Sequence, residues 1–162
     1  MQGLKKRKLW LIPLALLCFV QPIWADEQVP FNGTVAGYVT SVTPQDALHV
    51  LFEVTVSGIA THLGRFTGEA QVVQNVADGS YVGSFTWTAA NGDTISGTFF
   101  GQLIPTDTPG VFDNIQQSIL TGGTGRFANA TGGAEFLGQL DASTLSFVYP
   151  FEGTISSVGS QP

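Results

Sequence analysis

The chain has 162 residues, of which twelve are acidic and six are basic, and its only cysteine is Cys18. Four of the basic residues lie within positions 5–8, so the rest of the chain carries only Arg65 and Arg126 against all twelve carboxylates. A chain so poor in positive charge lacks the basic footprint of a nucleic-acid-binding protein. Because no cysteine follows Cys18, the rest of the chain excludes disulfides, thiolate catalysis and cysteine-ligated metals.

The N-terminal segment has the three parts of a secretory signal peptide. Its basic run, 5–8, precedes an apolar run, 9–20, and a small residue, Ala25, ends it. The apolar run is shorter than the ~20 residues that a membrane-spanning helix needs, and no comparable run follows. A lipid anchor on Cys18 is disfavoured because a large residue precedes it. We therefore predict export with cleavage near Ala25, no membrane span, and one domain over 26–162.

Apolar and polar residues alternate with a period of two along the rest of the chain. In the run 47–59, every second residue from Leu48 to Val56 is apolar, which predicts a strand with one buried face. Turn signals such as Asn91-Gly92 separate these runs, because both residues tolerate positive φ. We predict strands at about 33–43, 47–59, 64–76, 79–90, 93–104, 111–121, 133–141 and 144–156.

Eight long strands joined by short turns fit either a closed β-barrel or a two-sheet sandwich. Short sequential connections favour the barrel, because Greek-key sandwiches need longer crossovers. Glycines inside the strands favour it as well, since they permit the coiling and close approaches of a small barrel. They stand at positions 37, 68, 83, 97, 101 and 138. The prediction is an all-β, eight-stranded, antiparallel up-and-down barrel.

The longest connection between predicted strands is the glycine-rich segment 122–132. A loop of this length is typical of compact Ω-loops and of loops that carry function. A phosphate-binding loop would need a following helix and usually a lysine, and the sequence offers neither. We predict that the loop closes one end of the barrel, with Phe127 buried and Arg126 hydrogen-bonded to the backbone.

The same region carries a family resemblance. The segment 121–133, TGGTGRFANATGG, is followed by a strand and then by 144–154, TLSFVYPFEGT. These motifs resemble the signature of the allene oxide cyclase and dirigent barrel-like superfamily. The segment 58–67, GIATHLGRFT, is similar to one in uncharacterised exported bacterial members of that group. The resemblance implies an eight-stranded antiparallel barrel of calycin-like form, often oligomeric, with an apolar interior.

The resemblance does not by itself imply the cyclase reaction, because one fold hosts many functions. Similarity to the plant cyclases would imply ring closure of an unstable epoxide inside the barrel, aided by a buried carboxylate and an asparagine-bound water. The first predicted strand, including 32–39, has no acidic residue in a comparable position. The enzyme interpretation therefore lacks its motif.

Inward-facing aromatic residues are the candidate ligand contacts. In a small barrel, the core and any ligand cavity share the same surface, so an aromatic stripe is either packed core or a binding wall. Several such residues share a strand face in the alternating runs. The candidates are Phe52, Tyr81, Phe85, Trp87 and Tyr149.

The remaining polar candidates receive structural roles. His62 and Arg65 lie at a hairpin connection, where we expect the histidine to make a local hydrogen bond. Arg65 and Arg126 are expected to satisfy loop carbonyls or a carboxylate. His49 and His62 lack clustered carboxylates, so we predict no metal site and no cofactor. Four glutamates are expected to point outward, since an inward one would be a desolvated acid with a raised pKa. They are Glu53, Glu69, Glu135 and Glu152.

Three functions remain open from the sequence. The first and preferred one is an exported, non-catalytic barrel that binds a small apolar molecule, and a barrel filled with side chains would exclude it. The second is a cyclase- or dirigent-like protein that steers a reactive intermediate, against which an interior without polar groups would count. The third is a structural module that forms homo-oligomers, which a strictly monomeric protein would weaken.

Overall fold

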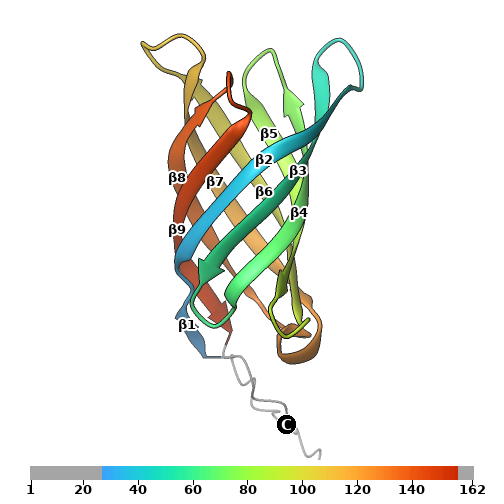
Figure 1. Cartoon of the computed structure of the whole chain (residues 1–162), viewed down its shortest axis with the longest axis vertical. Helices are drawn as coiled ribbons and strands as arrows, with labels where there is room; N and C mark the ends of the chain where they lie inside the picture. Colours follow the sequence, from blue (N-terminus) through green and yellow to red (C-terminus); the bar gives the residue numbers. More distant parts are fainter. Residues whose placement is uncertain (1–26, 157–162) are drawn as a thin grey trace, which may run out of the picture.

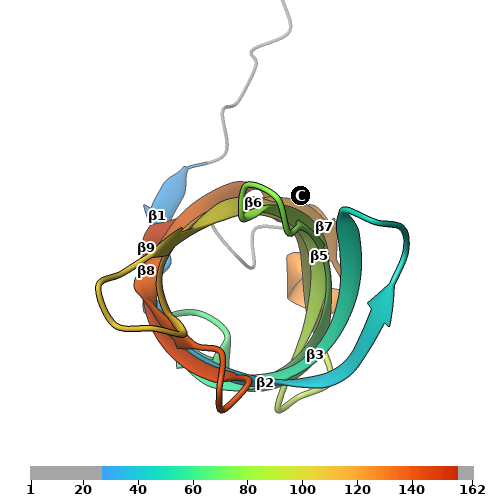
Figure 2. The same ribbon diagram turned by 90° about the horizontal axis from the view of Figure 1, so that it is seen from above.

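A closed antiparallel barrel makes up almost all of residues 27–156, the part of the chain that the computed structural model describes (Figures 1 and 2). Each of the long strands pairs with its neighbours in sequence, and the last pairs with both the first long strand and its predecessor, which closes the ring. The predicted all-β up-and-down barrel is therefore confirmed. The predicted signal segment, 1–25, lies outside the described residues.

The eight long strands match the eight predicted runs closely. They are β2 (Gly33–Pro44), β3 (His49–Ala60), β4 (Gly64–Asn75), β5 (Ser80–Ala89), β6 (Thr94–Pro105), β7 (Val111–Gly123), β8 (Gly132–Asp141) and β9 (Ser146–Ser156). A short strand, β1 (Gln28–Pro30), pairs with the end of β9 and was not predicted. In the described part of the chain the only helix is the single 3-10 turn η1 (Gly125–Phe127), so no helix there is long and apolar enough to cross a membrane.

The two ends of the barrel differ in how they are covered. Loops 45–48, 76–79, 106–110 and 142–145 gather at the upper end in Figure 1. The lower end carries β1 and the connection between β7 and β8 (Figure 1). We use "upper end" and "lower end" in this sense below.

The segment 122–132 folds back across the lower end, as predicted. Phe127 is 0% exposed there, beside the fully buried Ile95 and Ile155 in the same hydrophobic cluster. Backbone and side-chain hydrogen bonds between Thr124 and Thr94 tie the loop to the start of β6. This lower cluster closes the barrel like a plug.

The glycines inside the strands let aromatic rings lie flat across neighbouring strands. A side-chain carbon added at Gly68 would come within 2.7 Å of the Trp87 ring, and one at Gly97 would come equally close to Phe85. The other four predicted glycines lie under rings in the same way, as expected for close approaches in a small barrel. Their rings are Phe147 over Gly37, Phe99 over Gly83, Tyr81 over Gly101 and Tyr149 over Gly138.

Candidate functional site

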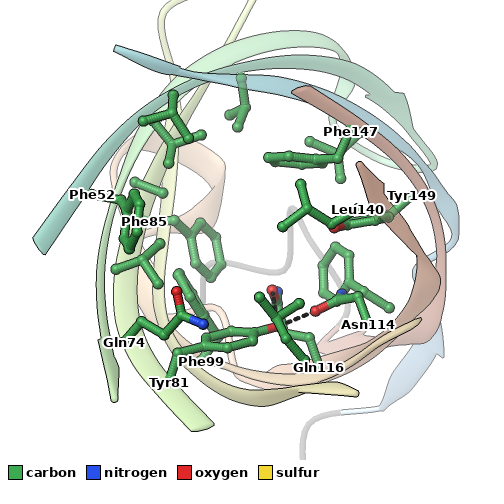
Figure 3. Close-up of a pocket in the computed structure, with 18 of the residues that line it drawn as sticks. Phe52, Gln74, Tyr81, Phe85, Phe99, Asn114, Gln116, Leu140, Phe147 and Tyr149 are labelled. Atoms are coloured by element: carbon green, nitrogen blue, oxygen red, sulfur yellow. Dashed lines mark hydrogen bonds between the residues drawn. The ribbon is translucent and has the colours of Figure 1, made fainter. Parts of the chain in front are cut away.

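A cavity of about 320 Å³ occupies the barrel above the plug (Figure 3). It reaches the upper end, because its lining includes the loop residue Leu145, which is 42% exposed. None of the fully buried plug residues lines it. Aromatic side chains form much of its wall. They are Phe52, Tyr81, Phe85, Trp87, Phe99, Phe112, Phe136, Phe147 and Tyr149.

All five predicted ligand contacts line this cavity. Trp87 stacks on Phe66 at its floor, with 4.3 Å between ring centroids, and Phe85 packs against Trp87 at 4.8 Å. Phe52 is half-buried higher in the wall. The aromatic stripes are thus core on the plug side and cavity wall on the upper side, while ligand contact itself stays a prediction.

Polar side chains that the sequence analysis missed enter the cavity from β7. Asn114 and Gln116 both line it, although Asn114 is only 3% exposed. The Tyr81 ring lies across Gly101 on β6 and so reaches past that strand to β7. Its hydroxyl donates to Asn114 Oδ1 at 2.5 Å and lies 3.2 Å from Gln116 Oε1 (Figure 3).

Within the described part of the chain, one polar atom of the Asn114 amide is hydrogen-bonded and the other is not. Its oxygen, Oδ1, accepts the hydrogen bond from the Tyr81 hydroxyl. The amide nitrogen, Nδ2, is buried without a hydrogen-bond partner among the described residues. Native interiors rarely leave such an atom unpaired, so this part of the cavity wall is unusual.

Tyr149 enters the cavity from β9, on the other side of Asn114. Its ring lies across Gly138, the β8 residue paired with Asn114, and stacks on Phe147 at 4.5 Å between centroids. The residue is only 6% exposed, and its hydroxyl has no hydrogen-bond partner in residues 27–156. Tyrosine is ordinarily neutral at physiological pH, and burial raises the pKa of both Tyr149 and Tyr81 further, so both phenols are neutral hydrogen-bond donors.

The cavity and its entrance have opposite electrostatic character. Within residues 27–156, no Asp, Glu, Lys, Arg or His side chain lines the cavity. The upper end, in contrast, has an aspartate in or beside each of its loops: Asp46, Asp78, Asp107 and Asp141. Hydrogen bonds from side chains and backbone N–H groups lower the pKa of three of them, so that these carboxylates are ionised at neutral pH; they are Asp46, Asp78 and Asp141.

The predicted structural residues lie away from the cavity. Arg126 pairs with a carboxylate, one of its two expected partners, and makes no side-chain hydrogen bond to the backbone of residues 27–156, where one was predicted: its Nε lies 3.7 Å from Asp93 Oδ2, and its guanidinium packs over the Phe127 ring. The Asp93 carboxylate therefore takes the place of the loop carbonyls as the partner of this guanidinium. Arg65 is exposed at the lower end, at the start of β4.

The two histidines have different surroundings. His62 is exposed with φ of 64°, and its ring makes no hydrogen bond to the described residues, so the expected local bond is wrong. The left-handed backbone of this tight turn directs the ring outward. His49 pairs with Asp46 at 2.9 Å. Residues 27–156 contain no cluster of three or more potential metal ligands. The four strand glutamates are all exposed, as predicted.

The outer face of β7 carries exposed isoleucines among its polar residues. Ile115 and Ile119 are 43% and 53% exposed, and Ile115 stands opposite Leu137 of β8, which is 51% exposed. Phe100 on β6 is 49% exposed on the same side. The formation of homo-oligomers stays a prediction, which sedimentation velocity of the chain would measure.

Comparisons with known proteins support the fold. No protein-family model matches the chain, and no curated protein matches it by sequence. Two solved structures of pterocarpan synthase dirigent proteins, GePTS1 and PsPTS1, do resemble it, each at 13% sequence identity. GePTS1 has a TM-score of 0.53 over 85% of this chain and 89% of its own. PsPTS1 has a TM-score of 0.51 over 85% of this chain and 100% of its own. The chain therefore shares the dirigent-type barrel fold.

Proposed function

We propose that this protein binds a small, uncharged, largely apolar molecule inside the barrel. The observation that carries the proposal is the cavity of about 320 Å³, which remains in a barrel whose lower part is tightly packed with side chains. Concave, mainly apolar pockets with a few polar groups are the usual form of small-molecule sites. A barrel that served only as scaffold would gain stability by filling this volume.

The lack of charge in the wall supports an uncharged ligand. A buried ion without a partner carries a desolvation cost far larger than the gain from apolar contacts. The chain's two arginines after the N-terminal segment, Arg65 and Arg126, are both at the lower end, outside the cavity. A carboxylate or phosphate ligand would therefore find no cation.

The same proposal includes export. The segment 1–25 has the pattern of a secretory signal, and it precedes the first described strand. N-terminal sequencing of the protein recovered outside the cytoplasm would test cleavage near Ala25. A retained, uncleaved N-terminus would contradict this part of the proposal.

Displacement of a neutral fluorophore tests the binding site. Prodan, an uncharged naphthalene whose emission shifts in apolar surroundings, should bind the chain and be displaced by a small aromatic ketone such as α-tetralone. Ala70→Trp would place an indole in the cavity, because Ala70 is half-buried in its wall, and should abolish both signals. The control is Gln71→Trp, which adds the same side chain at an exposed position of β4.

The two variants make the result decisive. If prodan binds equally to the wild type and to Ala70→Trp, its site is outside the barrel and the proposal is wrong. If Gln71→Trp alone weakens binding, the outer surface of β4 is the site instead. Circular dichroism of each variant establishes that the barrel is intact.

A dirigent-like role is the second candidate. The shared fold and the inward polar groups favour it, above all the neutral phenols of Tyr81 and Tyr149. Such a barrel would direct the outcome of a reaction of a bound intermediate without supplying a cofactor. Incubation with the precursor of the pterocarpan-forming reaction, followed by chiral chromatography, tests it. A product mixture identical to that without protein would contradict this role for that substrate.

A further inference from the structure

We infer that the ligand carries a neutral oxygen acceptor and that the Tyr149 hydroxyl donates a hydrogen bond to it. This inference rests on the proposed function and specifies the chemistry of the molecule that the cavity selects. It assigns Tyr149 as the residue that distinguishes an oxygen-bearing ligand, such as an aromatic ketone, from a hydrocarbon of the same shape.

The first step is to identify which polar groups are free to meet a ligand. The polar residues that line the cavity are Gln74, Tyr81, Asn114, Gln116 and Tyr149. The amides of Gln74 and Gln116 are only half-buried, on longer side chains, so they are less fixed as donors than a buried tyrosine. The Tyr81 proton is used in the bond to Asn114. Asn114 Nδ2 is unpaired, but it has essentially no accessible surface, so a ligand does not reach it without a side-chain movement. The Tyr149 hydroxyl is also unpaired, yet it is not among the fully enclosed atoms and therefore faces the cavity. In Figure 3 it points toward the lumen.

The second step is the cost of leaving that hydroxyl unpaired. Tyr149 is 6% exposed as a whole residue, and no group of residues 27–156 accepts from its hydroxyl, so the hydroxyl has lost part of its hydration without a protein partner in return. A packed phenylalanine would avoid this cost while preserving the stack on Phe147. A ligand oxygen that accepts a hydrogen bond from the Tyr149 hydroxyl would explain why the position carries tyrosine and not phenylalanine.

The third step is the rigidity of the donor. The Tyr149 ring is held between Phe147, 4.5 Å away on one face, and the backbone at Gly138. Held on both sides, the hydroxyl is oriented before the ligand arrives, so little entropy is lost on binding. The stacked pair also offers an aromatic wall beside the donor, which suits a ligand whose acceptor is attached to a planar ring.

The fourth step is the charge of the acceptor. The aspartates of the upper end lie at the entrance, and no cation lines the cavity in the described residues. An anion would be repelled at the entrance and unpaired inside. The Tyr149 phenol is neutral at physiological pH, as tyrosine ordinarily is, and burial raises its pKa further, so it provides a hydrogen bond without a compensating charge. A carbonyl, ether or hydroxyl oxygen satisfies these conditions, and a carboxylate does not.

The test compares two probes of nearly the same shape. α-Tetralone has a ring carbonyl and tetralin lacks it, and both are assayed by displacement of prodan, whose own affinity is measured for each variant. Tyr149→Phe should weaken α-tetralone binding by roughly threefold to tenfold, the usual effect of one neutral hydrogen bond, and leave tetralin unchanged. Tyr38→Phe is the control, because Tyr38 is an outward tyrosine that is 55% exposed.

The outcomes separate this inference from the proposed function. If prodan does not bind the wild type, or binds Ala70→Trp equally well, both proposals are overturned, whereas if prodan binds the cavity and neither probe displaces it, this inference alone is overturned. If both probes bind and Tyr149→Phe changes their affinities equally or not at all, the cavity binds ligands but Tyr149 is not the anchor. Urea unfolding without ligand adds a second readout: Tyr149→Phe should lose no stability, and a loss would assign the hydroxyl a structural partner instead.

Discussion

Truncation of Phe127 tests whether the loop between β7 and β8 is a structural plug. The side chain is 0% exposed at the lower end of the barrel. Phe127→Ala removes a whole ring from a packed cluster, and such substitutions cost about 3–5 kcal/mol in free energy of unfolding, since lost burial and the residual void both contribute. Small domains have only ~5–15 kcal/mol in total, so the variant should be folded but strongly destabilised.

Urea unfolding of the chain without residues 1–25 measures this loss. Trp87 is the only tryptophan after residue 24 and lies in the same hydrophobic cluster, so its emission reports the unfolding of the barrel. Arg126→Ala is the matched control, because its ion pair to Asp93 is partly exposed and should be worth less than about 1 kcal/mol. If Phe127→Ala costs no more than this control, the loop is not the plug that the packing indicates. Displacement of prodan by α-tetralone should persist in Phe127→Ala, since Phe127 does not line the cavity.

Two further predictions concern polar groups. Tyr81→Phe should lower the free energy of unfolding by about 1–3 kcal/mol, because it leaves the Asn114 oxygen unpaired. Adding Asn114→Leu to this variant should recover part of the loss. Strictly additive effects of the two substitutions in urea unfolding would contradict the hydrogen bond between the two side chains. Hydrogen bonds lower the pKa of Asp46, Asp78 and Asp141 in the folded chain, so their stabilising contribution is present above the ordinary aspartate pKa and is lost as the pH falls through the folded values. Thermal unfolding temperatures should therefore decline below about pH 4, and less steeply in Asp141→Asn, whereas equal acid profiles for both proteins would contradict this assignment.

The barrel itself was predictable because each of its strands buries one face. Alternation with a period of two follows directly from that burial, and the hairpin turns mark where it stops. The strand glycines also indicated a closed barrel, because a ring such as Trp87 lies across Gly68 only when neighbouring strands approach closely in a curved sheet. The strand β1 was missed because three residues, Gln28–Pro30, are too few to show a period.

The polar part of the site was not predictable, because each face of β7 mixes apolar and polar residues. Ile115 and Ile119 favour one face of the strand as the inward one, whereas Phe112 and Leu120 favour the other, so hydrophobicity alone does not decide which face is buried. Its register is nevertheless fixed by both neighbouring strands: Ser118 stands opposite the inward Phe99 of β6, and Ile115 opposite Leu137 of β8. A shift by one residue would exchange the two faces of β7 but would break the pairing with both neighbours.

The inward polar residues of β7 bear on function. An inward polar side chain loses hydration free energy unless it is hydrogen-bonded. Tyr81 bonds Asn114 Oδ1, and the Ala134 backbone bonds the Ser118 hydroxyl, but part of the need is left unmet. Local rules and global fold usually agree in natural sequences, and the exceptions concentrate at functional sites. Here the exception coincides with the cavity, and the unpaired hydroxyl of Tyr149 lies on the opposite side of Asn114 from Tyr81. A chain selected only to close a barrel would carry apolar side chains at positions 114 and 116, between the inward Phe112 and Leu120, and would fill this volume.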